Sequence, residues 1–154
     1  MADLAAVLAE IAAEMSAAKD RGAVASYIPE LALADPNWFG LSVVTVDGQS
    51  VDVGDHQQTF TIQSVSKPFT FGLAIETYGA ERVAKHVGVE PSGDAFNAIE
   101  LQNGTNRPFN PMVNAGAIAA SALIRGDSHE ERYQRILDTF ERFTGRRLAP
   151  LPPA

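Results

Sequence analysis

The sequence has no cysteine, fewer positive than negative charges and no long apolar run. Without cysteine the chain forms no disulfide, no Cys-based zinc site and no thiol nucleophile. Lysine and arginine together number 12 against 19 aspartates and glutamates, the formal net charge is −7, and the basic residues do not cluster. A nucleic-acid-binding surface is therefore not expected.

Apolar residues are also too interrupted to cross a membrane. The most apolar stretch, residues 111–124, is broken by Asn114, whereas a spanning helix needs about 20 apolar residues. The N-terminus carries Asp3 where a secretory signal peptide carries positive charge. These features predict a soluble, cytoplasmic protein that does not bind membranes.

Metal ligands are equally sparse. The three histidines are His56, His86 and His129, and none has a second histidine or a carboxylate cluster at ligand spacing. No metal site is predicted.

The residue pattern that is present predicts a helix, a hairpin and then further helices. Apolar residues recur at helical spacing near the N-terminus, which predicts a helix over residues 3–20 that ends near Gly22. Valines on both sides of Asp47-Gly48 predict a hairpin over residues 39–54, because Asp-Gly tolerates positive φ in a turn. Two strands alone are marginal in water, so this hairpin is expected to need further strands, and no later stretch offers one.

The C-terminal two thirds are expected to be mainly helical. A helix over residues 64–78 is followed by Gly79 as a stop signal. A helical region then covers residues 80–144, including a loop rich in Gly, Pro and Asn over residues 87–110 and a buried helix over residues 111–124. In its last helix, Tyr133 is expected on the packed face and Gly145 at the C-cap.

Ser64 and Lys67 lie three residues apart at the predicted start of the helix, in the stretch QSVSKPF. Residues i and i+3 share one helix face. A serine hydroxyl becomes a good nucleophile when a base takes its proton. The positive end of the helix dipole, together with burial beside Phe60 and Phe69, is expected to disfavour the ammonium form of Lys67. Backbone N–H groups at the helix start would supply half of an oxyanion hole.

The same four residues also have a purely structural interpretation. Serine is a favoured N-cap, lysine is an ordinary surface residue, and S-x-x-K occurs by chance in many proteins. Pro68 requires the helix to start close to Ser64 in either case, because proline fits only the first helical turn. The pattern alone therefore leaves catalysis and capping both open.

Longer motifs around this pair resemble the serine-dependent glutaminases. The stretches SYIPEL (26–31), DGQSVDVGD (47–55), FTIQSVSKPF (60–69), VGVEPSGDAFN (87–97) and NPMVNAGAI (110–118) occur in the order and spacing of that family. The resemblance covers roughly residues 4–145. It implies an α/β (α+β) fold of the β-lactamase/DD-peptidase-like type, and hydrolysis of L-glutamine to L-glutamate and ammonia.

The resemblance also implies roles for individual residues. Ser64 matches the nucleophile and Lys67 its base. Gln63, Tyr27 and Asn114 match residues that contact the substrate, Asn114 at its amino-acid end. A glutamine pocket needs several neutral donors and acceptors, which agrees with these side chains. Asn114 otherwise reads as a structural residue beside a buried helix, and it is expected to have a hydrogen-bond partner in either case. No cofactor is implied.

Members of that family are about twice as long as this chain. The resemblance therefore implies the N-terminal part of a single glutaminase domain, residues 1–154, without the remaining strands. A substrate-binding glutamate and asparagine, two active-site tyrosines and the second oxyanion donor would also be missing. The chain alone, whether a truncated gene product, a fragment or one piece of a split protein, is expected to be inactive. The full-length form is expected to be a homo-oligomer, a dimer or tetramer.

Two other functions remain open at this level. One is an acyl-serine hydrolase of the penicillin-recognising type, although the companion S-D-N motif is absent and FTG (143–145) lacks the lysine of K-T-G. The other is a catalytically dead interaction domain that keeps the N-terminal part of the fold.

Overall fold

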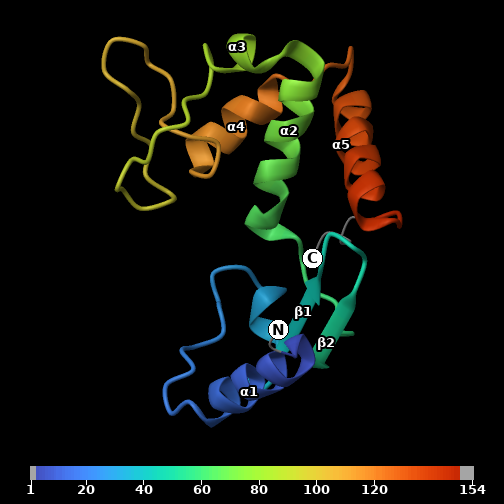
Figure 1. Ribbon diagram of the computed structural model, residues 1–154. Coiled ribbons are helices and arrows are strands. Elements are labelled where there is room, and N and C mark those ends of the chain that lie inside the picture. Colours follow the sequence, from blue (N-terminus) through green and yellow to red (C-terminus); the bar gives the residue numbers. More distant parts are fainter. Residues whose placement is uncertain (1–2, 150–154) are drawn as a thin grey trace. The chain divides into compact units, whose positions relative to one another are not determined.

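The computed structural model describes residues 3–149, which form two compact units (Figure 1). The first unit ends at Thr61 and the second begins at Ile62. Within the described residues no helix is both long and apolar enough to cross a membrane.

The first unit begins with helix α1 (Leu4–Ala17). The side chain of Asp3 caps it by accepting a hydrogen bond from the backbone N–H of Ala5 at 3.1 Å. The helix ends three residues before the predicted end at residue 20, because Ala18 adopts an extended backbone. The carboxylate of Asp20 instead accepts the backbone N–H of Gly22 at 3.0 Å, a local turn that competes with the helix.

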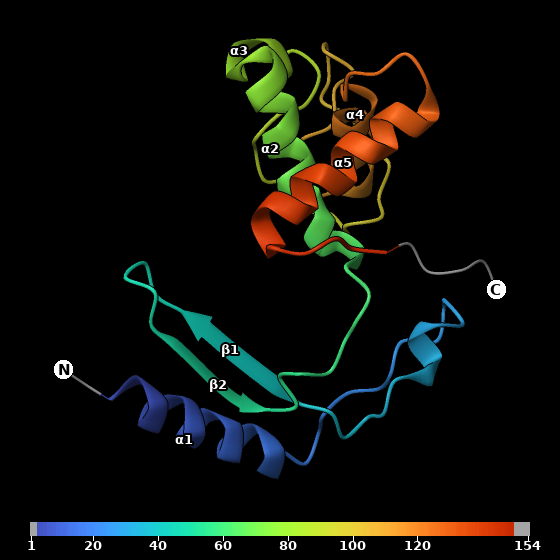
Figure 2. The same cartoon turned by 90° about the vertical axis from the view of Figure 1, so that its right-hand side faces the viewer.

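Strands β1 (Gly40–Val44) and β2 (Ser50–Gly54) form the predicted hairpin. They pair antiparallel, with Gly40 opposite Gly54. The partly buried residues alternate along both strands, and α1 lies alongside this small sheet (Figure 2). In the turn only Gly48 takes the positive φ, 88°, and its N–H bonds the carbonyl of Thr45. The sheet found in residues 3–149 has two strands.

The second unit begins with a 3₁₀ turn, η2 (Gln63–Val65), which leads into helix α2 (Ser66–Tyr78). The helix predicted over residues 64–78 therefore starts with a tighter turn, and Ser64 lies in that turn, before the α-helix proper. Gln63 has a φ of 42°, which is uncommon outside glycine. Gly79 ends α2 with a φ of 77°, as predicted.

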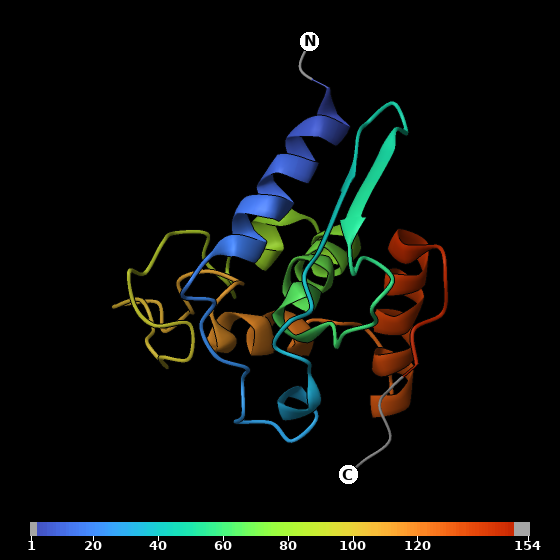
Figure 3. The same cartoon turned by 90° about the horizontal axis from the view of Figure 1, so that it is seen from below.

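Three further helices follow: α3 (Ala80–Val83), α4 (Asn114–Ala122) and α5 (His129–Thr144). The helical region predicted over residues 80–144 is therefore interrupted by a long non-helical segment that contains the expected loop. The middle of this segment lies on the side of α4 away from α5 (Figures 1 and 3). Gly145 ends α5 in the left-handed conformation, with a φ of 68°, as predicted.

The core of the second unit lies where α2 contacts α3, α4 and α5. Ala74, Val83 and Ile124 are buried there, and six partly buried residues pack around them. Helix α4, which contacts α2, consists mostly of alanine and glycine. The helix predicted to be buried over residues 111–124 is thus shorter and only partly buried, with Gly116 and Ala120 shielded and Ile118 71% exposed.

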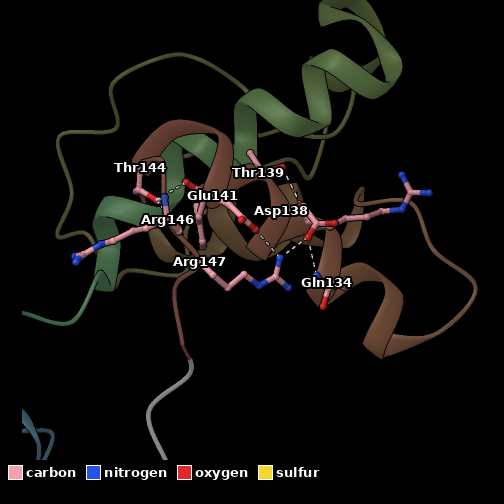
Figure 4. Close-up of polar contacts among 9 residues, drawn as sticks. Gln134, Asp138, Thr139, Glu141, Thr144, Arg146 and Arg147 are labelled. Atoms are coloured by element: carbon pink, nitrogen blue, oxygen red, sulfur yellow. Dashed lines mark hydrogen bonds and ion pairs between the residues drawn. The ribbon is translucent and has the colours of Figure 1, made fainter.

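Helix α5 packs through Phe140, whose ring meets Phe69 of α2 edge-on at 6.2 Å between centroids. Tyr133, predicted on the packed face, is 41% exposed. After the helix ends, the guanidinium of Arg147 turns back to pair with Asp138 at 2.6 Å and Glu141 at 3.0 Å (Figure 4). This contact holds the segment that follows Gly145 against α5.

Candidate active site

Lys67 is the second residue of α2, and its amine is held by the segment that leads into α4. The Nζ atom donates to the backbone carbonyl of Met112 at 2.7 Å and to the Oδ1 atom of Asn114 at 2.8 Å. It also lies 6.0 Å from the centroid of the Phe96 ring. Three groups from outside α2 therefore surround one half-buried amine.

The sequence predicts Phe60 and Phe69 beside this lysine. Phe60 belongs to the first unit, and its place beside Lys67 stays a prediction. Phe69 packs against α5, with its ring centroid 4.9 Å from that of Phe143. Phe96, from the long loop, is an aromatic group that lies near the amine and was not predicted there. Both hydrogen-bond acceptors of Lys67, a backbone carbonyl and an amide oxygen, are neutral groups. Among residues 62–149 no ion pair involves Lys67.

Ser64 is exposed in η2, one turn before Lys67. In the second unit as described, its hydroxyl makes no side-chain hydrogen bond, whereas the Lys67 amine is already bonded towards α4. Ser66, two residues on, donates its hydroxyl to the carbonyl of Gln63 at 2.7 Å and so closes the turn that carries Ser64. Ser64 is thus an exposed residue without a side-chain hydrogen bond in the described part of this unit, and its pairing with Lys67 stays a prediction.

The two other predicted contact residues lie at exposed positions. Gln63 is exposed at the start of η2. Tyr27 is 75% exposed and lies in the first unit, just before a short 3₁₀ turn (Leu31–Leu33). A role in substrate binding remains a prediction for both.

Asn114 is the first residue of α4 and joins two parts of the site. Its backbone N–H bonds the carbonyl of Phe96 at 2.8 Å, while its side-chain oxygen accepts from Lys67. The expectation that this asparagine has a hydrogen-bond partner is therefore confirmed. Its Nδ2 group makes no hydrogen bond among the residues described in the second unit. An amide donor beside Lys67 is thus free to meet a ligand.

Sequence reasoning did not identify the contacts of Met112 and Phe96 with the lysine amine. A backbone carbonyl leaves no mark in the identity of its residue, so Met112 had no signal. Phe96 lies within the motif VGVEPSGDAFN, but the motif does not say which side chain it approaches. Both contacts depend on how a loop distant in sequence folds back onto α2.

The chain matches known proteins along most of its length. The glutaminase family model matches residues 22–150. A glutaminase from Microcystis aeruginosa is 63% identical over 125 residues, which cover 81% of this chain and 37% of that protein. A glutaminase from Nostoc sp. is 57% identical over 124 residues, covering 80% of this chain and 37% of that protein.

Solved structures agree with these matches. A crystal structure of Mglu in its glutamate form has a TM-score of 0.85 at 41% identity, over 97% of this chain and 35% of that one. A Bacillus subtilis probable glutaminase has a TM-score of 0.68 at 38% identity, over 72% of this chain and 36% of that one. The chain thus spans little more than a third of the length of these relatives. The predicted fold class, a partial β-lactamase-like fold with helices and a small antiparallel sheet, is confirmed. The chain belongs to the glutaminase family.

Proposed function

We propose that this chain supplies the nucleophile, its base and one substrate-binding amide to an active site that hydrolyses L-glutamine to L-glutamate and ammonia. Ser64 is the nucleophile, Lys67 the base, and Asn114 the amide. Gln63 and Tyr27 contact the substrate. The working protein is a cytoplasmic homo-oligomer that needs no cofactor.

The reaction proceeds through an ester on Ser64. The Ser64 hydroxyl transfers its proton to the neutral Lys67 amine, which acts together with a tyrosine from the part of the domain outside this chain, as its oxygen attacks the side-chain carboxamide carbon of glutamine. The tetrahedral intermediate expels ammonia, which leaves with the proton that the amine returns. Water then attacks the ester, and glutamate is released with Ser64 regenerated. Backbone N–H groups at the start of the helix would supply one half of the oxyanion hole.

One observation carries the proposal: the amine of Lys67 is 2.8 Å from the side-chain oxygen of Asn114. The two residues are 47 positions apart, and each belongs to a separate motif that resembles the glutaminases. The contact orients the Asn114 amide so that its Nδ2 donor is available for a substrate carboxylate. A single polar centre thus combines a base with a binding group.

By itself the chain is proposed to have negligible turnover. It spans 37% of the Microcystis relative, so pocket residues from the remaining length are not present. Removing one oxyanion donor from an enzyme raises the barrier by about 3 kcal/mol. An incomplete glutamine pocket would raise it further. Purified chain, mixed with glutamine and assayed for ammonia, is expected to match a blank without protein.

A chimera tests the chemistry directly. The stretch of this chain that matches the Microcystis glutaminase would replace the corresponding segment of that protein. The chimera is expected to release ammonia from glutamine, and Ser64→Ala or Lys67→Met to lower kcat/KM by at least about 1,000-fold, because each removes a group required for covalent catalysis. Ser121→Ala, an exposed serine on α4, is the matched control and should leave the rate unchanged.

The outcomes separate the proposal from its alternatives. Undiminished turnover by the Ser64→Ala chimera would refute the nucleophile assignment. A folded chimera that neither turns over nor takes up heat on titration with glutamine would favour a non-catalytic interaction domain. Labelling of Ser64 by a fluorescent penicillin would favour a penicillin-recognising enzyme.

A further inference from the structure

Asn110 makes more side-chain hydrogen bonds than any other residue near the lysine amine, although it does not touch the amine itself. Its Oδ1 atom accepts the backbone N–H of Met112 at 3.0 Å and that of Val113 at 3.2 Å. Its Nδ2 group donates to the carbonyl of Glu90 at 2.9 Å. One half-buried side chain thus connects the long loop to the segment that enters α4.

These bonds define the direction of the Met112 carbonyl. A backbone N–H and the carbonyl of the same residue are linked through only two soft dihedral angles, so fixing the Met112 and Val113 N–H groups restricts the peptide between them. That peptide carries the carbonyl oxygen that accepts from Lys67 at 2.7 Å. The next residue is Asn114, which supplies the second acceptor.

The backbone of Asn110 is held as well. A Cβ atom on Gly116, in the first turns of α4, would overlap the Asn110 carbonyl, so this close approach requires glycine there. Both the backbone and the side chain of Asn110 are therefore fixed against the start of α4. Rotation of the Asn110 side chain would release two N–H groups and leave the Met112 carbonyl free to turn away from Lys67.

We propose that Asn110 is a positioning residue that holds the Lys67 amine by orienting the Met112 carbonyl. The value of this for catalysis rests on the proposed function, in which Lys67 is the base. The positioning itself is measurable in this chain without turnover. Lysine occurs at Lys19, Lys67 and Lys85, and the first and last are exposed, so two internal references accompany the amine of interest.

Competitive acylation of the whole chain with trace acetic anhydride, followed by peptide mass spectrometry, gives the relative reactivity of each lysine. In the unmodified chain Lys67 is expected to react more slowly than Lys85, because its half-buried amine is held in place by two hydrogen bonds and is less accessible to the reagent than the exposed Lys85. Asn110→Ala is expected to raise the rate at Lys67 relative to Lys85 by about fivefold, the equivalent of one ordinary hydrogen bond. Asn103→Ala, an exposed asparagine in the same loop, is the matched control and should change nothing.

Asn110→Asp distinguishes positioning from general loosening. This variant keeps an oxygen that accepts from the Met112 and Val113 N–H groups but loses the donor to the Glu90 carbonyl. Because the bonds that orient the Met112 carbonyl are retained, the acylation rate of Lys67 should stay within about twofold of the rate in the unmodified chain. The measurement is made at raised salt to screen the added charge.

An unchanged Lys67 rate in folded Asn110→Ala would overturn the proposal, as would equal acceleration in both variants. If Asn110→Ala does not fold, as judged by circular dichroism, Asn110→Asp decides alone: slow labelling supports positioning and fast labelling refutes it. Expected labelling together with an inactive chimera would leave the positioning intact while rejecting the proposed function. The two can therefore fail separately.

Discussion

The two units of this chain differ in how many apolar side chains they bury. In residues 3–61, Leu8 is the one apolar side chain that is fully shielded, and α1 and the hairpin cover each other only partly. In residues 62–149, buried apolar side chains come from all four helices and from the chain between them: Ala74, Val83, Val87, Ala120, Ile124 and Phe140. The comparison indicates that the second unit contains its own core, whereas the first has little apolar area out of water with which to offset the entropy of folding.

The largest expected effect comes from opening the core of the second unit. Ile124 is 3% exposed, so Ile124→Ala should lower the free energy of unfolding of that unit by about 2–5 kcal/mol through lost burial and a cavity. The matched change in the first unit, Val44→Ala, affects a side chain that is 71% exposed and should cost under about 0.5 kcal/mol.

Two probes can follow the units during denaturation. Trp38 is the one tryptophan of the chain and reports on the first unit, while far-ultraviolet circular dichroism reports mainly on the helices of the second. Ile124→Ala should move the circular dichroism transition more than the Trp38 fluorescence transition. Equal shifts would mean that the two units unfold as one, and the contrast between them would be lost.

A smaller effect is expected from a backbone change in the first unit. Gly54, at the end of β2, has a φ of 66°, and a Cβ atom there would overlap the carbonyl of Phe39. Gly54→Ala should therefore cost the roughly 1 kcal/mol of a left-handed residue plus the cost of the overlap. Gly22 has a similar φ of 71° with open space around it, so Gly22→Ala isolates the conformational part.

Urea titration monitored by Trp38 fluorescence gives the free energy of unfolding of each glycine variant. A larger loss for Gly54→Ala than for Gly22→Ala would show that the hairpin depends on this close approach at its open end. Equal losses would mean that the chain near Phe39 yields easily, which would sharpen the view that the first unit is loosely packed.

The smallest effect is a surface ion pair in the second unit. Arg142 of α5 lies 3.1 Å from Glu76 of α2, and the hydrogen bond and charge of this guanidinium hold the pKa of the Glu76 carboxyl below its ordinary value. A carboxyl whose pKa is lowered in the folded state stabilises the fold above its unfolded pKa. That stabilisation disappears as the pH falls through the folded pKa.

Glu76→Gln should therefore lower the melting temperature slightly at neutral pH, by about 2 °C or less because the pair is exposed, and not at all in strong acid. Glu81→Gln, which removes an acidic side chain that forms no ion pair among the described residues, controls for net charge. A difference that persisted unchanged into strong acid would contradict the assignment.

Local signals in the sequence placed most elements correctly. Gly79 and Gly145 ended helices because glycine adopts positive φ without steric cost, and Asp47-Gly48 located the hairpin turn. Errors arose where side chains competed with backbone bonds or where distant segments met. Asp20 formed a local turn instead of continuing α1, and Ser66 closed a 3₁₀ turn where a regular α-helix was expected.

In the candidate site, too, local motifs could be recognised from the sequence, whereas contacts between distant segments could not. Ser64 and Lys67, in one motif, and Asn114, in another, are proposed as site residues because these motifs resemble those of the glutaminases. Their arrangement could not be recognised: the Met112 carbonyl is chemically identical to every other carbonyl, and Asn110 is one asparagine among several. Only contacts between residues about 45 positions apart reveal that these groups converge on one amine.

By itself the sequence indicated the family, through motifs that resemble the glutaminases, and determined the order of the helices and the hairpin, which neighbouring residues and their periodicity encode. The tertiary structure decided what surrounds the lysine. Long-range packing of the loop onto α2 selects which neutral acceptors and which aromatic ring reach that amine, and a linear pattern holds no record of that choice.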